Sequence, residues 1–532
     1  MTAEAPVAII PEPLRVTRLG TSVRLGDGLK IVAPAEFGQA ARFLRAVFEQ
    51  GAGWDVEIVG PGVSGTNMVR LVVDSAVEHA EGYALSVRDG AVTISGKSPA
   101  GAFYGAQTLR QLLPAALWRS APVSPELSID LGGVEIDDAP GYSWRGVHLD
   151  VSRHFMPKGF ILRLIDLIAM HKCNVLHLHL TDDQGWRMPV AKYPKLVEVG
   201  AWRRASPAGH YRERASDGRP HGGHYSTDDL REIVAYAAQR FITVLPEIDM
   251  PGHMVAAIAA YPQLGNTLDQ REVMTTWGIS EHVLNLDPET IAFCTDVLDE
   301  VMEVFPSRYV HVGGDECPVT EWKSNPRAQA LMRQEGFSEE RQLQGWFTAK
   351  IAEHLAGHGR VLVGWDEILE GGAPAGSVVM SWRGEGGGID AAKAGHDVVM
   401  APMQSLYFDW SYADDPREPL AICPAISVAG VYAYDPTPEA IPAERRHHVL
   451  GAQCELWTEY VPGPEHAEYL YFPRVCAFAE VVWSGGRDAP RPPFPDFERR
   501  LAVHIERLAA LGVNYRPLDG PTPGQARIWQ RE

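Results

Sequence analysis

Eight short apolar runs, separated by longer stretches, dominate the sequence from Tyr142 onward. The clearest separating stretches are amphipathic and predict helices at residues 160–172, 227–240 and 288–305, the last with Asp287 as N-cap and Pro288 in its first turn. Runs of this kind alternating with helices are typical of α/β proteins with a parallel sheet, and eight strands close a TIM barrel. The runs are residues 145–151, 174–180, 242–248, 309–314, 361–365, 377–382, 397–402 and 449–457. We therefore predict a (β/α)8 barrel over residues 141–515.

The first 140 residues follow a different pattern. Residues 69–74, 83–89 and 91–96 alternate apolar and polar side chains, Asp89-Gly90 forms a tight-turn signal between the last two, and residues 101–114 have a helical pattern. No group of acids, bases or metal ligands gathers there. We predict a small α+β domain with a supporting role at residues 1–140, and a C-terminal tail at residues 516–532.

Charge and composition exclude several classes of partner. The chain has 48 Lys and Arg against 68 Asp and Glu, a net charge of −20, so neither nucleic acid nor an anionic membrane is expected to bind it. No run approaches the roughly 18 to 20 apolar residues of a spanning helix. The first 16 residues lack the pattern of a secretion signal, so we expect a cytoplasmic protein, or a secreted one whose signal is absent from this sequence. The six cysteines form no C-x-x-C pair and predict buried thiols rather than a zinc cage or disulfides.

Polar and aromatic residues collect just after the predicted strands, where a barrel places its active site. Tryptophan faces stack on pyranose rings, and carboxylates and Arg bind sugar hydroxyls. Carboxylates also carry out the hydrolysis of glycosidic bonds. These positions are Asp150 and Arg153, Asp182, Glu247 and Asp249 with His253, Asp315 and Glu316, Trp365, Trp382, Tyr407 and Asp409, and Trp457 with Glu459. The sequence therefore predicts a sugar site with carboxylate chemistry.

The most informative motif is YVHVGGDE at residues 309–316, a strand followed by two glycines and two adjacent acids. Adjacent acids cannot easily flank a glycosidic bond from opposite sides, as an acid and a nucleophile must. One acid can protonate the leaving oxygen while its neighbour orients another group. A nucleophile supplied by the substrate, such as a 2-acetamido carbonyl, explains both acids.

The sequence resembles the retaining β-N-acetylhexosaminidases of glycoside hydrolase family 20. The resemblance covers about residues 140–510 through LDVSRHF, HLHLTDDQGWR, PEIDMPGH, HVGGDE, VGWDE, YFD and LWTEY, and residues 1–140 are similar to the family's small N-terminal domain. It implies exo-acting release of terminal β-linked N-acetylglucosamine, and of N-acetylgalactosamine, from an oligosaccharide or glycoconjugate through an oxazolinium intermediate. It implies no metal and no organic cofactor, and the sequence does not indicate an oligomeric state.

The resemblance also assigns roles to individual residues. It makes Glu316 the general acid and base, and it makes Asp315 and Tyr407 the groups that orient the acetamido group. The remaining roles concern binding and support: Trp365, Trp382 and Trp457 would enclose the N-acetyl methyl group, Arg153, Asp409 and Glu459 would bind sugar hydroxyls, and Asp182 with His253 would support Glu316.

Two alternative functions remain open. The pair His177 and His179 on the second predicted strand is also how metal-dependent amidohydrolase barrels begin, although those enzymes carry it on the first strand. A non-catalytic sugar-binding protein would keep the tryptophans but lose the acid. Two departures concern substrate range: the polar, helical insertion at residues 317–345, which shorter family members lack, and the long loop at residues 203–225. Both are expected to shape the leaving-group side.

Overall fold

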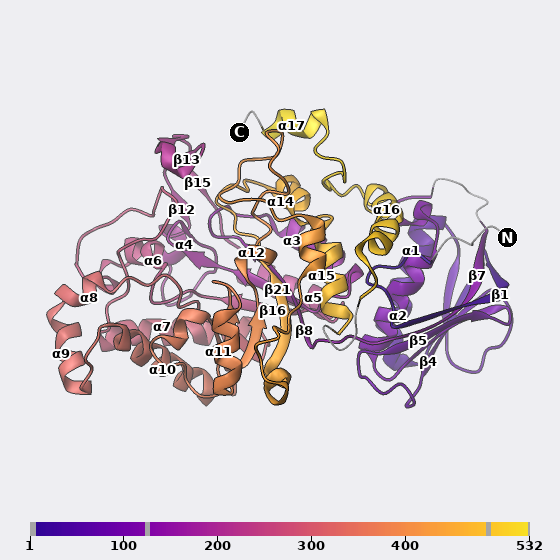
Figure 1. The fold of residues 1–532 in the computed structure, drawn as a ribbon, viewed down its shortest axis with the longest axis horizontal. Coiled ribbons are helices and arrows are strands. Elements are labelled where there is room, and N and C mark those ends of the chain that lie inside the picture. The colour runs from indigo at the N-terminus through magenta and orange to yellow at the C-terminus, as the bar shows by residue number, and fades with distance from the viewer. Residues whose placement is uncertain (1–6, 123–127, 486–490, 530–532) are drawn as a thin grey trace.

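The computed structural model describes residues 7–122, 128–485 and 491–529. A sheet domain formed by the N-terminal part of the chain lies beside a closed barrel, and helix α16 (Phe494–Ala510) returns to the side of the sheet domain (Figure 1). The start of the predicted N-terminal domain (residues 1–6) and the end of the predicted C-terminal tail (residues 530–532) lie outside the described residues. Within that part, no helix combines the length and apolarity needed to cross a bilayer.

The barrel is built from eight parallel strands, closed by pairing of the last with the first. In chain order they are β8 Trp144–Asp150, β9 Val175–His179, β16 Thr243–Glu247, β17 Tyr309–His311, β18 Val361–Trp365, β19 Val378–Ser381, β20 Asp397–Met400 and β21 Val449–Cys454. Each strand overlaps one of the eight predicted apolar runs. The predicted fold, a TIM barrel preceded by a small α+β domain, is therefore confirmed.

Helices surround the barrel and occupy its long loops. The larger ones are α3 Lys158–Met170, α5 Thr227–Ala238, α7 Pro288–Val304, α9 Pro326–Glu335, α10 Arg341–Gly357, α11 Gly386–Ala394 and α15 Arg474–Trp483. The smaller ones are α4 Lys195–Glu198, α6 Val255–Ala260, α8 Thr320–Ser324, α12 Met403–Leu406, α13 Val428–Ala433, α14 Pro464–Tyr471 and α17 Pro523–Trp529. Short strand pairs also occur, β10 Thr181–Asp182 with β11 Gly185–Trp186, β12 Trp202–Arg203 with β15 His221–Gly222, and β13 Pro207–Ala208 with β14 Ala215–Ser216.

Helix α7 begins where the sequence predicts, but not for the predicted reason. Asp287 occupies the N-cap position and Pro288 the first turn, yet the Asp287 side chain makes no capping hydrogen bond. Its carboxylate pairs instead with Arg327 of α9. The thiol prediction holds for five cysteines, which are buried, whereas Cys423 is partly exposed and all six are unpaired.

The N-terminal domain is a seven-stranded mixed sheet in the order β1-β7-β5-β6-β4-β2-β3. Its strands are β1 Arg15–Leu25, β2 Leu29–Val32, β3 Val56–Val59, β4 Met68–Val73, β5 Tyr83–Arg88, β6 Ala91–Gly96 and β7 Ile129–Asp138, and its helices are α1 Gly38–Ala52 and α2 Pro99–Leu112. The predicted turn joins β5 to β6, with φ of 52° at Asp89 and 77° at Gly90. Positive φ at both residues is what a two-residue hairpin turn of type I′ requires.

A buried ion pair joins the two domains. Lys172, two residues after the end of α3, places its ammonium 2.7 Å from Asp138 of β7 and 2.9 Å from the hydroxyl of Tyr83. The indole N–H of Trp483 in α15 donates to the other Asp138 oxygen at 2.8 Å. Both charged side chains are fully buried. The pair therefore depends on each partner, because neither charge can be solvated.

We expect Asp138→Ala to lower the free energy of unfolding by about 3–5 kcal/mol, because Lys172 would be left as an uncompensated buried charge. The matched control is Asp137→Ala, one residue away. Asp137 pairs with Arg15 on the surface, with 48% of its side chain exposed. An exposed pair contributes about 1 kcal/mol or less. Urea unfolding of both variants measures the difference, and equal losses would contradict the assigned role of the buried pair.

Candidate active site

The carboxyl ends of four neighbouring strands carry polar side chains in register. Asp150 of β8 pairs with His179 of β9, His179 with Glu247 of β16, and Glu247 with His311 of β17. All four are 0–1% exposed. Parallel pairing at this level places charged groups side by side at the end of the barrel where active sites form. The remaining site residues lie on the loops directly above this layer.

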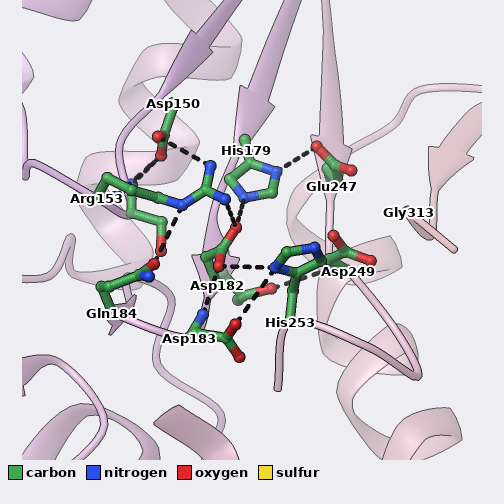
Figure 2. Close-up of polar contacts among 12 residues, drawn as sticks. Asp150, Arg153, His179, Asp182, Asp183, Gln184, Glu247, Asp249, His253 and Gly313 are labelled. Carbon is green, nitrogen blue, oxygen red and sulfur yellow. Dashed lines mark hydrogen bonds and ion pairs between the residues drawn. The ribbon is translucent and has the colours of Figure 1, made fainter. Parts of the chain in front are cut away.

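Arg153, Asp182 and His253 form one connected network (Figure 2). The Arg153 guanidinium lies 2.8 Å from Asp182 Oδ2 and 3.3 Å from Asp150 Oδ2, and its Nε donates to Gln184 at 3.1 Å. The other Asp182 oxygen lies 3.1 Å from His253 Nδ1. The predicted support pair of Asp182 and His253 is thus in contact, and Arg153 belongs to the same cluster.

The two glycines of the VGGDE segment allow the chain to turn tightly under the acids. Gly313 and Gly314 have φ of 63° and 92°, and a Cβ atom on Gly313 would overlap the Asp249 carboxylate. The Gly314 N–H instead donates to Asp249 Oδ1 at 3.1 Å. Glu316 itself has φ of 45°, a left-handed conformation that costs a non-glycine residue energy and is found mostly at functional sites.

This turn brings both acids to the same histidine. His253 Nε2 lies 3.7 Å from Asp315 Oδ2 and 3.6 Å from Glu316 Oε2. Both carboxyl groups therefore approach the site from the same side, as their adjacency in the sequence predicted.

The predicted insertion is helical, and its last helix braces the acid turn. It forms α8, α9 and the start of α10. From α10, Gln344 donates to the carbonyl of Gly314 at 2.6 Å, and Arg341 donates to the carbonyl of Cys317 at 2.9 Å. This part of the insertion thus fixes the backbone of the turn that carries Asp315 and Glu316.

Charge states in the cluster follow from its burial and pairing. Burial alone would lower the pKa of His253, but Asp182 and Asp183 outweigh it and raise that pKa well above its usual value, so the ring is an imidazolium at neutral pH. Burial raises the pKa of Asp182, but Arg153 and His253 outweigh it, so that pKa lies below its usual value. Burial and the neighbouring Asp315 raise the pKa of Asp249 well above its usual range. Burial and Glu316 also raise the pKa of Asp315, although His253 opposes them, so Asp249 is the more readily protonated of the two carboxyl groups.

Four aromatic rings, those of Trp365, Trp457, Tyr407 and Trp382, form a continuous group at the site. The ring centroids of Trp365 and Trp457 are 5.8 Å apart, those of Trp457 and Tyr407 6.2 Å, and those of Tyr407 and Trp382 6.2 Å with nearly parallel planes. Trp365 is oriented by its N–H bond to Glu247 at 2.9 Å, and Trp382 by its bond to Glu367, also at 2.9 Å. Four rings grouped in this way suit the apolar face of a sugar and a small methyl group.

The last two predicted binding residues complete the pocket near Arg153. Burial and Glu459 raise the pKa of Asp409 well above its usual range. Burial lowers the pKa of Arg153, but Asp182 and Glu459 outweigh it and raise that pKa well above its usual value. Glu459 therefore interacts electrostatically with the guanidinium. Among the described residues, the buried Asp409 Oδ1 and Asp315 Oδ1 atoms have no hydrogen-bond partner. Buried acceptors in a pocket of this kind are suited to ligand N–H and O–H groups.

The structure therefore gathers the acids, the aromatic group and the Arg153 cluster at one end of the barrel, as predicted. Sequence reasoning placed Glu247 and Asp249 at the end of the barrel and considered His179 only as a metal ligand, but it gave none of them, nor Glu367, an individual role in the sugar site. The available signal was their position, inside or directly after the predicted strands. The loop at residues 203–225 contributes Ser206 to Gly209 and Arg219 to a cavity of about 530 Å³ that Glu459 also lines.

Several groups of histidines and carboxylates come close enough to hold a metal ion, including His177 with Glu247 and His311. In this group, His177 Nδ1 bonds to Gln453 at 2.8 Å and His311 Nδ1 accepts the Gly313 N–H at 3.1 Å, whereas His177 Nε2 and His311 Nε2 have no hydrogen-bond partner among the described residues. Both rings lie close to Glu247, at 3.1 and 3.0 Å. Metal analysis of the purified protein distinguishes a charge-paired barrel core from a metal centre.

Comparisons with known proteins agree with this arrangement. The profile of the glycosyl hydrolase family 20 catalytic domain matches residues 142–486, and that of the family's domain 2 matches residues 7–139. A beta-hexosaminidase of Porphyromonas gingivalis is 42% identical over 96% of this chain, which spans 64% of that protein's length.

Solved structures of the family are similar over nearly the whole chain. A β-N-acetylhexosaminidase of Streptomyces coelicolor superposes with a TM-score of 0.83 at 30% identity, over 98% of both chains. An exo β-N-acetylglucosaminidase of Vibrio harveyi, solved with N-acetylglucosamine, gives 0.84 at 29% identity over 96% of this chain and 78% of that one. With the two family domains in the family's order, the chain belongs to glycoside hydrolase family 20.

Proposed function

We propose that the protein is an exo-acting, retaining β-N-acetylhexosaminidase that removes terminal β-linked N-acetylglucosamine or N-acetylgalactosamine by substrate-assisted catalysis. The observation that carries the mechanism is the placement of Asp315 and Glu316 within 3.7 Å of the same His253 nitrogen. Two carboxyl groups on one side of the sugar cannot serve as acid and opposed nucleophile. The substrate's own acetamido oxygen therefore supplies the attack.

In the first step, Glu316 donates its proton to the leaving oxygen as the bond between C1 and that oxygen breaks. The acetamido carbonyl oxygen forms a new bond to C1 from the opposite face and gives a cyclic oxazolinium ion. Asp315 accepts the N–H of this ion and balances its positive charge, while Tyr407 donates to the acetamido oxygen. Trp365, Trp382 and Trp457 enclose the methyl group and exclude water from that face.

In the second step, Glu316 removes a proton from water as the water oxygen attacks C1. The ring bond between C1 and the acetamido oxygen breaks, and the sugar is released with its original β configuration. Two inversions at C1 give overall retention. The acid of the first step thus becomes the base of the second.

The exo mode is supported by the Arg153 end of the pocket. Arg153, with Asp409 and Glu459, offers a cation and two carboxyl groups suited to the hydroxyls of a terminal sugar. Arg153 is 8% exposed and held by Asp150, Asp182 and Gln184, so this end is rigid. Structural neighbours from Vibrio harveyi and Streptomyces plicatus were solved with N-acetylglucosamine, which supports this sugar as the substrate unit.

The test compares 4-nitrophenyl N-acetyl-β-D-glucosaminide with 4-nitrophenyl β-D-glucoside, which lacks the acetamido group. We expect release of nitrophenol from the first and at least a ~10³-fold lower rate with the second, because the intramolecular nucleophile is missing. Similar rates would mean that a protein carboxylate attacks C1. Binding of the sugar without turnover would favour a sugar-binding protein, and stoichiometric zinc would favour the amidohydrolase alternative.

A further inference from the structure

A fully buried ion pair, His179 with Glu247, adjoins Asp182, and the mechanism above does not use it. His179 Nδ1 is 2.6 Å from Glu247 Oε2, and His179 Nε2 is 2.8 Å from Asp182 Oδ2 (Figure 2). The side chains of His179 and Glu247 are 1% and 0% exposed. A charged pair in this position costs solvation energy, so it calls for an explanation beyond packing.

Asp182 is held by four donors, which is the full capacity of a carboxylate. Its Oδ2 faces His179 Nε2 at 2.8 Å and Arg153 Nη2 at 2.8 Å. Its Oδ1 accepts the Asp183 N–H at 2.6 Å and faces His253 Nδ1 at 3.1 Å. Because His179 and Arg153 occupy one oxygen, the other is fixed in direction toward His253.

Glu247 connects His179 with the aromatic group at the site. Its Oε2 holds His179, and its Oε1 accepts the Trp365 indole N–H at 2.9 Å. Burial raises the pKa of Glu247, but His179 and His311 outweigh it and lower that pKa well below its usual range. Burial lowers the pKa of His179, but Glu247 and Asp182 outweigh it and raise that pKa well above its usual value. The pair is therefore carboxylate and imidazolium, and the signs alternate from Glu247 through His179 and Asp182 to His253.

We infer that His179 and Glu247 are positioning residues for the general acid: they hold Asp182, and through it the His253 imidazolium, against Glu316. The inference rests on the role proposed for Glu316. When Glu316 gives up its proton, a negative charge develops 3.6 Å from His253 Nε2. An imidazolium held at that distance stabilises the charge, whereas a ring free to turn or to lose its proton does not.

The carboxyl groups around His253 come from three loops, after β9, β16 and β17. They are Asp182 and Asp183, Asp249, and Asp315 with Glu316. Arg153 is the cation that faces Asp182 from the loop after β8. Of these carboxyl groups, Asp182 is the one that contacts the buried pair of His179 and Glu247, through His179 Nε2. Loss of that pair should therefore act on His253 through Asp182 while leaving the other groups in place.

The experiment measures the pH profile and leaving-group dependence of His179→Gln and Glu247→Gln. Loss of the His179 charge alone would raise the pKa of His253, but an Asp182 carboxylate free to turn away from His253 lowers it. We expect the second effect to be larger because Asp182 contacts the His253 ring directly, so the alkaline limb of kcat/KM moves to lower pH. At the wild-type optimum, we expect about 10-fold or greater loss on N,N′-diacetylchitobiose and a smaller loss on the 4-nitrophenyl substrate, because only the first needs full protonation of its leaving group. The second variant serves if the first does not fold, as judged by circular dichroism.

The matched control is His177→Gln. His177 lies on the same strand, is 0% exposed, and also faces Glu247, at 3.1 Å, but it bonds to Gln453 rather than to Asp182. It should lose thermal stability as His179→Gln does, without moving the alkaline limb. Equal pH profiles for the two variants would overturn the inference. Failure of the proposed function would appear separately, as equal losses on both substrates in Glu316→Gln.

Discussion

Glu316→Gln is expected to lower kcat/KM for N,N′-diacetylchitobiose by about 10³-fold. For the 4-nitrophenyl glycoside, the rate of glycosidic bond cleavage should fall by about 10-fold or less. A sugar alkoxide is a poor leaving group and needs a proton, whereas nitrophenolate leaves without one. General acid catalysis typically contributes about 10²- to 10⁴-fold, which sets the size of the difference. Gln keeps the shape of the side chain and removes only its proton-transfer function.

A nucleophile that needs no deprotonation separates the two roles of Glu316. Azide can attack C1 of the oxazolinium ion directly, so it should accelerate turnover of the aryl substrate by Glu316→Gln and give the β-glycosyl azide. Wild-type enzyme, which has its base, should show little acceleration. Equal loss on both substrates, or an α-azide product, would contradict the assignment of Glu316 as acid and base in a retaining mechanism.

The barrel could be predicted from the sequence because its strands are buried on both faces and appear as continuous apolar runs. The site could be predicted in outline because the carboxyl ends of parallel strands meet at one end of the barrel. Asp315 and Glu316 follow their strand within a few residues and Trp365 is the last residue of its strand, so their side chains had to lie there.

The connections among these residues could not be predicted, because they depend on register and side-chain direction. Glu247 meets His179 across 68 positions of sequence, and Trp365 meets Glu247 across 118. Asp287 shows the same limit: the local pattern placed the start of α7, but the partner of its carboxylate came from an insertion 40 residues away. The pairing of Asp138 with Lys172 likewise depends on how two domains dock.

The second large effect is expected for Asp315→Asn, which should lower kcat for acetamido substrates by about 10²- to 10³-fold, or about 2.7–4 kcal/mol of transition-state stabilisation. The carboxylate of Asp315 balances the charge of the oxazolinium ion, and an amide of the same shape cannot do so. Asp249 supplies the control, because its pKa is raised well above the usual range and it is the more readily protonated of the two carboxyl groups. Asp249→Asn replaces a neutral carboxyl group with a neutral amide of the same shape and should cost about 10-fold or less.

The two variants also differ in how they bind a cyclic analogue of the intermediate, such as a thiazoline in which sulfur replaces the ring oxygen. If Asp315 acts on the charged intermediate, its loss should weaken analogue binding and kcat/KM in parallel while product N-acetylglucosamine binds nearly as before. A purely structural contribution would weaken all three together. If Asp249→Asn lost as much activity as Asp315→Asn, the charge would belong to the pair as a whole, and Asp315 alone could not be the group that stabilises the oxazolinium ion.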